Sequence, residues 1–435
     1  MDPPYNTEAS KNDGNSIADD KENVAANKFV YRDKYSRNGW LNLMNERLKL
    51  AKELLKDDGV IFVSIDDSEQ AYLKVLMDEI FGEENFVVNL NYQKKNSGSG
   101  ADTKYIRQLT EYILFYAKDI DKLKINEIKK DIRNESRYKY TDEFVETRGK
   151  YQRKQLDMAS LTWSSGLDYE IEIDGKKYYA GGSKERWIDR QSGKHALKDW
   201  RWRWSKEKLQ WGLENKFIEV INNKIFTKQY QFVDNNNNNT IRTEKYTNII
   251  NNVMNSVGTE EQKSIFNVKV FDSPKPVELI IHLIKIVEKT QDTRILDFFA
   301  GSGTTGHAVL ELNREDGGNR TFTLVTNNQN NIGLDVNYER LYRINHGKGT
   351  KDETFEWGKK NQPYRSNLDV FNIEHIDVSL FQNKDNIRAI INKLIKVLND
   401  FGIKTNLQNP NEYLNLLNSL HSLKPELKKD EDEIN

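Results

Sequence analysis

The sequence contains no cysteine, which excludes disulfide bonds, thiolate metal sites and a cysteine nucleophile. Apolar runs such as Val60 to Ile65 and Ile280 to Val287 are far shorter than the ~20 residues that a transmembrane helix needs. The first residues also lack the apolar core of a signal peptide. These absences predict a cytoplasmic protein with no membrane partner.

An excess of charge of one sign is lacking too, because 66 Lys and Arg residues face 67 Asp and Glu residues, for a formal net charge of -1. A protein that attracts nucleic acid through its overall field is strongly basic, so any such surface here must be local. With 37% hydrophobic residues in 435, the chain is long enough for one large domain or for two to three smaller ones.

Two parts of the chain, residues 1–121 and 266–344, alternate predicted helices with predicted strands, which is typical of a layered α/β sheet. In the first part, apolar residues three and four apart predict a helix from Trp40 to Lys56, and a second helix from Glu69 to Phe81 follows a buried strand. Because the two patterns match, we expect one sheet that residues 122–265 split in the sequence. The predicted strands are Val60–Ile65, Phe86–Tyr92, Tyr112–Ala117, Arg294–Phe298 and Thr321–Thr326, and the helices of the second part begin at Pro276 and Thr304.

Residues 122–265 form the predicted insert. Its first part, to about Gln231, loses the α/β pattern and carries more Lys and Arg than Asp and Glu. The clearest element is a β-hairpin, in which Asp174-Gly175 makes a favoured two-residue turn between Tyr169–Ile173 and Lys176–Tyr179. The sequence therefore predicts a separate, locally basic module within the α/β region.

A tryptophan-rich segment follows in the insert, where Trp200, Trp202 and Trp204 alternate with Arg201 and Arg203. Aromatic and basic residues in this order could stack on bases or bind phosphates. More often, however, alternating Trp residues on a strand fill a small core while the Arg residues face solvent. We favour the second interpretation.

Three further segments have the composition of loops or flexible regions. Lys94 to Lys104 contains Gly and Ser flanked by lysines, which predicts a mobile loop that closes over a substrate. The run Asn235 to Asn239 predicts a surface loop. Residues 345–435 form a predicted C-terminal region with helical patterning at Ile387–Phe401 and Tyr413–Leu423 and a charged tail.

The chain begins with a motif that we call the hook, Asp2-Pro3-Pro4-Tyr5. Prolines fix φ and remove N–H donors, so the hook should be rigid. The Asp2 carboxylate and the Pro3 carbonyl can each accept a hydrogen from a planar amine, which leaves the nitrogen lone pair nucleophilic, and Tyr5 can stack on a base. Taken alone, the same four residues would also fit an ordinary turn.

A second motif, the glycine turn, is Phe299-Ala300-Gly301-Ser302-Gly303, between a predicted strand and a predicted helix. Glycines let the backbone pass close to a ligand, and a helix N-terminus offers free N–H groups. Gly301, Gly303 and Gly306 match the G-x-G-x-x-G pattern of dinucleotide sites, which alone does not separate a cofactor site from a tight turn. His307 stands where a P-loop has lysine, so a P-loop is excluded.

The hook followed later by the glycine turn resembles the beta arrangement of the DNA amino-methyltransferases, in which an Asp-Pro-Pro-Tyr motif precedes a Phe-x-Gly-x-Gly cofactor motif. More closely, the chain resembles the modification (Mod) subunits of type III restriction-modification systems. The resemblance covers most of the region before residue 345. The matching stretches are Asp2–Thr7, Trp40–Glu69, Phe81–Phe86, Phe271–Val277, Leu296–Gly306 and Phe322–Asn331.

This resemblance implies an α/β fold with a Rossmann-like S-adenosylmethionine-dependent methyltransferase sheet, split by an inserted α+β target-recognition region and followed by a helical C-terminal extension. It implies methyl transfer from S-adenosylmethionine to the N6 amine of adenine in a specific DNA sequence. The target adenine would flip out of double-stranded DNA to reach the hook. The implied partners are DNA and a restriction subunit with nuclease or helicase activity, and a homodimer is left open.

The resemblance also implies roles for residues. The hook, Asp2, Pro3, Pro4 and Tyr5, would be catalytic, and no metal would be needed. Asp297 would lie near the ammonium group of the cofactor, while Ser64 and Asp66 would line the target pocket, support the hook or simply cap their strand. The implied cofactor-binding residues are Asp297, Phe298, Phe299, Ala300, Gly301, Ser302, Gly303, Thr304, Thr305, Lys275 and Pro276, and the DNA-binding candidates are Lys94, Lys95, Arg201 and Arg203.

Two features depart from the family pattern. Asp2 directly follows Met1, whereas the family's hook emerges from a buried strand. We therefore hypothesise a truncated or split chain whose hook is held from one side only and whose activity alone is weak. After the second strand of the cofactor region, the segment from Thr326 to Gln329 lacks the acid that often holds ribose hydroxyls, and Gln329 is the candidate to replace it.

Four other functions can be compared with adenine-N6 methylation: methylation of cytosine at carbon five or at N4, DNA binding without catalysis, and nicotinamide-dependent oxidoreduction. Methylation at cytosine carbon five needs a cysteine nucleophile, which the chain lacks. Asp at the first hook position favours adenine over cytosine N4 by family tendency. A DNA-binding specificity chain without catalysis would bind DNA but incorporate no methyl groups. A nicotinamide-dependent oxidoreductase built on the glycine turn would make the hook a coincidence.

Overall fold

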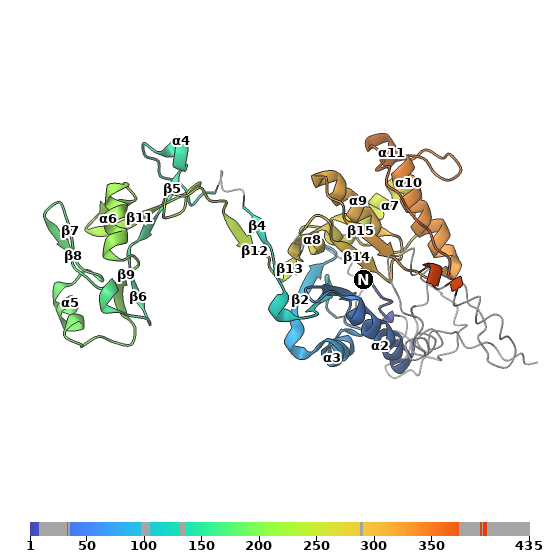
Figure 1. Cartoon of the computed structure of the whole chain (residues 1–435), viewed down its shortest axis with the longest axis horizontal. Helices are drawn as coiled ribbons and strands as arrows, with labels where there is room; N and C mark the ends of the chain where they lie inside the picture. The colour runs from blue at the N-terminus through green and yellow to red at the C-terminus, as the bar shows by residue number, and fades with distance from the viewer. Residues whose placement is uncertain are drawn as a thin grey trace, which may run out of the picture. The chain divides into compact units, whose positions relative to one another are not determined.

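The computed structural model describes residues 1–7, 33, 35–96, 105–130, 135–287, 290–373, 392–393 and 395–397. The chain divides into two compact units, Met1–Arg365 and Ser366–Asn435. Figure 1 labels the elements of the first unit. The predicted helix Tyr413–Leu423, the charged tail, most of Ile387–Phe401 and residues 97–104 of the predicted loop lie outside the described residues.

A four-stranded sheet lies at the centre of the first part of the chain (Figure 1). The strand order is β1 (Val60–Ile65), β3 (Thr110–Ala117), β2 (Phe86–Gln93) and β13 (Ile249–Ile250). β3 is antiparallel to both of its neighbours, and β13 is parallel to β2. The predicted strands are thus confirmed within two residues, and β13 joins the sheet from beyond most of the insert.

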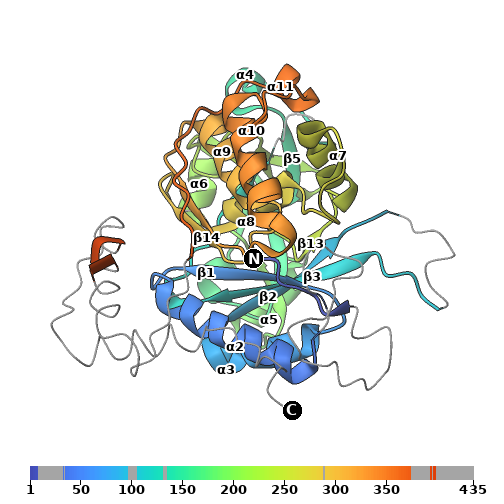
Figure 2. The same cartoon turned by 90° about the vertical axis from the view of Figure 1, so that its right-hand side faces the viewer.

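Helices cover both faces of this sheet (Figure 2). On one face, α2 (Arg37–Leu54) and α3 (Gln70–Phe81) pack against β3 through Leu114 and Tyr116. On the other face, α8 (Val277–Val287) packs against Ile113 and Phe115 of the same strand. Because side chains alternate along a strand, β3 packs against helices on both faces of the sheet.

The cofactor half of the predicted fold forms a β-α-β unit. β14 (Arg294–Asp297) is parallel to β15 (Thr321–Leu324), and α9 (Thr304–Asp316) connects them. These bounds confirm the predicted strands and helix. The expected single sheet is wrong, because β14 and β15 form a two-stranded sheet of their own and the described residues place no strand between β14 and β1. Leu296 on β14 accordingly remains 39% exposed.

The remaining helices of this half follow the sheet elements. A π-helical segment leads directly into α10, and α7 packs against α10 and α11. The first unit therefore continues to Arg365, beyond the predicted domain boundary at residue 344. The bounds are α7 (Asn255–Phe266), the π-helix (Ile332–Tyr338), α10 (Glu339–His346) and α11 (Glu356–Lys360), with short 3-10 helices at Glu83–Asn85, Ile120–Lys122, Ser165–Leu167 and Gln329–Asn331.

The insert leaves and rejoins the sheet through two paired strands, β4 (Glu127–Lys129) and β12 (Thr243–Lys245), which are antiparallel. Between them lie small sheets of the orders β10-β11-β5, β6-β9 and β7-β8. The elements are α4 (Val145–Arg148), β5 (Tyr151–Gln155), β6 (Asp157–Ser160), β7 (Ile171–Ile173), β8 (Lys176–Tyr178), α5 (Lys184–Gln191), β9 (Asp199–Trp202), α6 (Lys206–Glu214), β10 (Ile218–Ile221) and β11 (Lys224–Tyr230).

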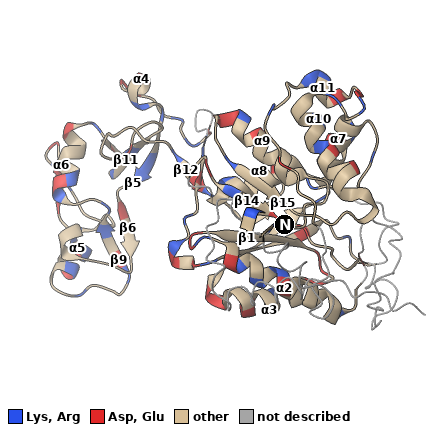
Figure 3. Ribbon diagram, turned by 45° about the vertical axis from the view of Figure 1, so that its right-hand side comes forward, with Lys and Arg blue, Asp and Glu red and all other residues tan. Residues whose placement is uncertain are grey.

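The local predictions for the insert are largely confirmed. The predicted hairpin is β7-β8, and its turn residues Asp174 and Gly175 have φ of 51° and 75°, as a type I′ turn requires. Trp202 is buried in the insert core, whereas Trp200 is 39% exposed, so the expected alternation holds for only part of the segment. Figure 3 shows that basic and acidic residues are interspersed on α6, so the basic excess does not gather on this helix.

Candidate active site

The hook is held in place by the residue that precedes it, Met1. The amino group of Met1 donates to the Phe62 carbonyl at 2.9 Å, and the Ser64 amide donates to the Met1 carbonyl at 3.1 Å. Met1 thus pairs with β1 as a parallel strand does. The expectation that the hook is held from one side only is therefore wrong, because β1 supplies backbone partners before Asp2.

The other end of the hook is anchored by side chains from distant segments. Trp40 Nε1 on α2 donates to the Pro4 carbonyl at 2.8 Å. Asn6, which is buried and has φ of +60°, donates from Nδ2 to Glu69 at 2.8 Å and accepts from the Tyr35 amide at 2.8 Å. Trp40 thus occupies the Pro4 carbonyl, whereas the described residues provide no donor to the preceding carbonyl of Pro3.

A buried charge network surrounds the hook. Lys275 Nζ lies 2.7 Å from Glu111 Oε1, 2.9 Å from the Tyr5 hydroxyl and 3.4 Å from Asp2 Oδ1. Tyr5 itself donates to Asp2 Oδ1 at 2.8 Å. Glu111, at the beginning of β3, is 2% exposed, and Lys94 Nζ lies 3.6 Å from its other oxygen. The side chain of Asp2 remains 36% exposed, so solvent or a ligand can reach its carboxylate.

The charges in this network shift one another's proton affinities. Burial raises the pKa of Asp2; Lys275 lowers it and Glu111 raises it, and the net shift is upward. Burial and the neighbouring Asp2 raise the pKa of Tyr5 well above its ordinary value, which keeps its hydroxyl a donor. Burial opposes the charge of Lys275, but Asp2 and Glu111 outweigh it and raise the pKa of the lysine.

The glycine turn is shaped mainly by its own residues. Gly301 and Gly303 have φ of 47° and 77°, in the left-handed region that favours glycine. Asp297 at the end of β14 accepts from the Phe299 amide at 3.2 Å and from the Thr305 hydroxyl at 2.6 Å. Asp297 therefore braces the turn, in addition to the ligand contact that the resemblance implies for it.

Arg340 supports the same turn from α10. It is fully buried, and its Nη1 donates to the Thr304 hydroxyl at 2.9 Å, while Nη2 lies 3.2 Å from His307 Nδ1. Burial and the charges of Arg340 and Arg314 hold the pKa of His307 well below its usual value. His307 is thus a neutral core residue behind the turn.

The residues of the turn fit a ligand that approaches the backbone closely. A Cβ at Gly301 would lie 3.4 Å from the Phe271 ring, and α9 begins at Gly303 without a side-chain cap. A helix start without a cap leaves N–H groups for a ligand. Ser302 and Thr304 are buried instead and contact Arg340, so these two predicted residues support the turn from within.

Packing unites the hook and the turn, which are almost 300 residues apart in the sequence. Met1 and Tyr5 pack against the same hydrophobic cluster as Phe298 and Phe299. Lys275, from the segment that precedes α8, contacts the Tyr5 hydroxyl. Pro276 is buried immediately before α8 begins, as expected for a proline at a helix start. The two motifs therefore pack against one apolar cluster.

Other predicted residues take different positions. Lys94 faces Glu111, while Arg201 Nη2 donates to the Thr162 hydroxyl at 3.1 Å and Arg203 Nε donates to the Gln155 carbonyl at 3.2 Å. Lys95, at the other predicted DNA-binding position, donates from its amide to the Leu109 carbonyl at 3.4 Å. These four residues are thus spread over the catalytic half and the insert.

At the ends of the strands, the predicted polar residues make local contacts. The Ser64 backbone supports Met1, and Asp66 Oδ1 accepts from the Ser68 amide at 2.9 Å, as a capping residue does. After β15, Asn328 Oδ1 accepts from the amides of Gly333 and Leu334 at 3.1 and 3.2 Å. The segment from Thr326 to Gln329, where the family often has a ribose-binding acid, therefore also begins a helical turn.

Four residues of the site escaped the sequence interpretation: Glu111, Trp40, Asn6 and Arg340. Glu111 gave one signal, since an acid next to the apolar run Tyr112–Ala117 must find a partner if it is buried. Asn6 and Trp40 lie within the stretches that match the family but were given no role, and Arg340 gave no signal, because the partners of all three are distant in the sequence.

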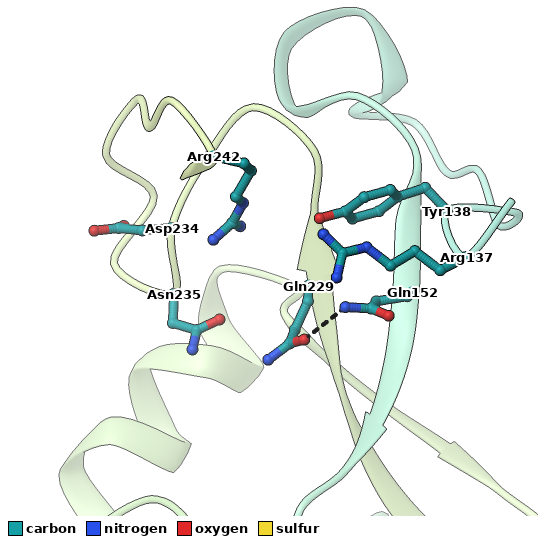
Figure 4. Close-up of a pocket in the computed structure, with 7 residues that line it drawn as sticks. All are labelled: Arg137, Tyr138, Gln152, Gln229, Asp234, Asn235 and Arg242. Carbon is teal, nitrogen blue, oxygen red and sulfur yellow. Dashed lines mark hydrogen bonds between the residues drawn. The ribbon is translucent and has the colours of Figure 1, made fainter. Parts of the chain in front are cut away.

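The insert contains a polar pocket, which Figure 4 shows from close by. Gln152 on β5 and Gln229 on β11 are cross-strand neighbours, and Gln152 Nε2 donates to Gln229 Oε1 at 3.0 Å. Arg242 Nη2 donates to the carbonyls of Tyr230 and Val233 at 2.8 and 2.9 Å. The lining consists of Arg137, Tyr138, Gln152, Gln229, Asp234, Asn235 and Arg242.

The described residues contain neither a membrane-spanning helix nor a metal-binding cluster. No helix in this part of the chain has both the length and the apolar character for crossing a membrane. Within the same described ranges, His, Asp and Glu side chains form no group of three or more that could hold a metal ion.

Comparison with known proteins gives several relatives. The chain is 33% identical over 332 residues to the type III restriction-modification enzyme StyLTI Mod subunit of Salmonella typhimurium, a match that covers 73% of the chain and 46% of the relative. It is 29% identical to the EcoPI Mod subunit of Escherichia phage P1, over 96% of the chain and 66% of that protein. The chain thus spans about half to two thirds of the length of these Mod subunits.

A shorter relative is covered more completely. The type II methyltransferase M.KpnI of Klebsiella pneumoniae is 32% identical, and the match covers 79% of the chain and 78% of the relative. A family model described as DNA methylase matches residues 1–346, which include the hook, the insert and the glycine turn. The chain therefore belongs to the DNA methylase family.

Proposed function

We propose that this chain transfers a methyl group from S-adenosylmethionine to the N6 amine of adenine in DNA. The observation that carries the proposal is that the hook and the glycine turn pack against one apolar cluster, through Tyr5 and Phe299. One segment offers acceptors for an amine, and the other offers a close backbone approach for a cofactor. Family membership and the Mod subunits among the relatives support the same reaction.

The hook has the acceptors that an exocyclic amine requires. Trp40 fixes the Pro4 carbonyl, so the chain direction at Pro3 is set and its carbonyl is not used within the hook. The Asp2 carboxylate, 36% exposed, is the second acceptor. Two acceptors on one amino group orient its lone pair away from the ring plane, toward the methyl donor.

The reaction balances with these groups alone. S-adenosylmethionine supplies an electrophilic methyl group on a sulfonium. A bond forms between the amine nitrogen and the methyl carbon while the carbon–sulfur bond breaks, and the nitrogen then releases one proton. The Asp2 carboxylate accepts this proton and returns it to solvent, since part of its side chain is exposed. The donated hydrogen bond of Tyr5 holds the carboxylate during the transfer.

The cofactor region fits this donor in three ways. Gly301 and Gly303 keep side chains away from the turn, and α9 begins there without a side-chain cap. Phe298 and Phe299 pack against the same hydrophobic cluster as Tyr5 of the hook and offer apolar surface to the cofactor. Asp297 would bind the ammonium of the methionine moiety with lone pairs that its two internal bonds leave over.

We also infer that the insert recognises DNA. Its polar pocket combines amide side chains, which suit the edge of adenine, with two arginines, which suit guanine or phosphate (Figure 4). The cross-strand pair of Gln152 and Gln229 holds both amides in place. The Mod subunits among the relatives are parts of restriction-modification enzymes by name, so a restriction subunit is the partner that we propose.

The test of the reaction is incubation of the chain with methyl-labelled S-adenosylmethionine and fragmented genomic DNA. Digestion of the DNA to nucleosides and chromatography should place the label in N6-methyladenine. Label in N4-methylcytosine would show that the target base is cytosine and not adenine. Binding of DNA without label would instead identify a recognition chain without catalysis.

The test of the insert is sequencing of the methylated sites produced by the wild type and by Gln229→Leu. Loss of one amide should relax the base preference at one position of the target sequence, since a bidentate contact contributes about 1–3 kcal/mol of discrimination. Gln210→Leu on α6, whose amide pairs with Glu214 at 2.8 Å, is the matched control. An unchanged preference in Gln229→Leu would contradict the inferred role of the pocket.

A further inference from the structure

We propose that Glu111 is a positioning residue, which holds the ammonium of Lys275 away from Asp2 and so keeps Asp2 free to accept a hydrogen from the target amine. This inference rests on the proposed methyl transfer and adds a residue to it. Glu111 contacts neither the amine nor the cofactor in this scheme, and it acts through Lys275.

The distances show how the lysine is shared. Lys275 Nζ lies 2.7 Å from Glu111 but 3.4 Å from Asp2, although both carboxylates are within reach of one ammonium. Lys275 is 8% exposed and Glu111 is 2% exposed, so water screens this pair little. The stronger, shorter contact is thus made with the acid that has no place in the reaction.

The arrangement solves a problem of charge. The partial burial of Asp2 favours its protonated form when no cation is near, and a protonated carboxyl can donate to the amine instead of accepting from it. A lysine paired only with Asp2 would occupy the acceptor positions that the amine needs. When Glu111 is the principal partner of Lys275, the positive charge of the lysine still stabilises the ionised form of Asp2. The Asp2 carboxylate then keeps lone pairs that can accept a hydrogen bond from the target amine.

Several other groups face the network. Tyr5 donates to Asp2, and the amino group of Met1 lowers its pKa slightly. Lys94 faces Glu111 from the end of β2. Burial, followed by Asp2, Glu111 and then Asp66, raises the pKa of Tyr5. Burial and Glu111 raise the pKa of Tyr92 on β2. Because both tyrosines stay neutral from pH 5 to 9, they add no charge to the network. The charge around Asp2 is therefore set by Glu111, Lys275, Lys94 and the amino group of Met1.

The two partners should therefore shift the titration of Asp2 in opposite directions. Glu111 raises the pKa of Asp2, so its removal lowers that pKa and moves the acid limb of the rate profile to lower pH. Lys275 lowers the pKa of Asp2, so its removal moves the limb to higher pH. A general loss of structure would not produce opposite shifts.

The experiment measures single-turnover methylation of fragmented genomic DNA from pH 5 to 9 by the full chain and by Glu111→Gln and Lys275→Met. We expect the plateau rate of Glu111→Gln to fall on the order of 10- to 100-fold, as misplacement of a reacting group does, with its acid limb at lower pH. Glu315→Gln, which removes an exposed acid paired with Lys285, is the control and should match the wild type. The proposal would be overturned if the acid limb of the rate profile lay at the same pH in all variants, or if it moved in the same direction in Glu111→Gln and Lys275→Met.

A second measurement does not depend on activity. The chain is labelled with ¹³C in the Asp side-chain carboxyls, and the Asp2 resonance is identified by its absence in Asp2→Asn. Its titration midpoint should fall in Glu111→Gln and rise in Lys275→Met. If the wild type transfers no methyl group but these shifts are seen, the proposed function fails while the placement of Asp2 stands. An unmoved midpoint contradicts the role of Glu111 in either case.

Discussion

The hook and the glycine turn are two short motifs of one site, but they are held in different ways. Contacts of the hook and of Met1 before it come from Phe62, Trp40, Glu111 and Lys275, which belong to four separate segments. The turn is braced mainly from within, since Asp297 binds groups only two and eight residues further on. The hook therefore depends on the whole fold, whereas the turn depends largely on its own sequence.

This difference predicts which substitutions act at a distance. A change far away in the sequence can displace the hook without altering any of its residues. A change must fall within the turn, or on a residue behind it such as Arg340 or Asn337, whose Nδ2 donates to the Gly301 carbonyl at 3.1 Å, to displace the turn. The substitutions below are ordered from the largest expected effect to the smallest, and each tests one side of the contrast.

Asp2→Ala should have the largest effect on the hook. It removes an acceptor for the amine, and loss of one preorganised polar group at a reacting centre costs on the order of 10²- to 10³-fold in rate. Single-turnover methylation measures the effect, and calorimetry should show an almost unchanged affinity for S-adenosylmethionine. Asp121→Ala, at an exposed position, is the control. Near-normal rates in Asp2→Ala would remove the hook from the reaction.

Trp40→Phe tests whether the hook depends on a distant helix. It removes the hydrogen bond to Pro4, and the unsatisfied buried carbonyl should lower the free energy of unfolding by about 1–3 kcal/mol. The matched control is Trp202→Phe in the insert core, where Nε1 donates to the Tyr169 carbonyl at 2.7 Å. Denaturant unfolding should show similar losses for both variants. Only Trp40→Phe should also lower kcat, and equal kcat values would contradict the long-range support.

Gly303→Ala tests the turn. An alanine with φ of +77° is strained by about 1–2 kcal/mol, and relaxation of the strain would move the amides at the start of α9. Gly317→Ala, with φ of +71° at the other end of α9 and open space around it, carries the same strain. Thermal unfolding should report comparable losses. The Kd for S-adenosylmethionine should rise, about tenfold for 1.4 kcal/mol, only in Gly303→Ala, and a rise in both variants would argue against a ligand at the turn.

His307 should give the smallest effect, through pH. Burial and Arg340 depress its pKa in the folded protein, so below its ordinary value of 6.5 the unfolded chain takes up a proton that the folded chain does not. The free energy of unfolding should therefore fall as the pH decreases from 7 to 5.5. This part of the slope should be smaller in His307→Asn, as measured by denaturant titration at several pH values. An equal slope would show that His307 titrates normally.

The contrast also explains what the sequence could predict. Strands such as Val60–Ile65 and the Asp174-Gly175 hairpin turn are encoded by local patterns, and both were predicted at or near their observed bounds. The glycine turn is local as well. The contacts of Trp40 and Glu111 with the hook, and of Asn6 after the hook with Glu69, join residues far apart in the sequence, and a single sequence does not show which buried polar groups meet.

Two predictions failed for a related reason. The single sheet was expected from matching helix and strand patterns, but strand neighbours are set by which edges find backbone partners, and among the described residues β14 pairs only with β15. The one-sided attachment of the hook was expected from its position in the sequence. Pairing of Met1 with β1 uses backbone atoms, which leave no mark on the side-chain pattern.

The paired strands β4 and β12 have a consequence for how such proteins diversify. Because the outgoing and returning chains hydrogen-bond to each other, any domain spliced between Lys129 and Thr243 would begin and end at neighbouring points. Neither the hook nor the glycine turn lies within that stretch. Under the proposed function, exchange of the residues between these strands would change the DNA sequence that is recognised and leave the hook and the glycine turn unchanged.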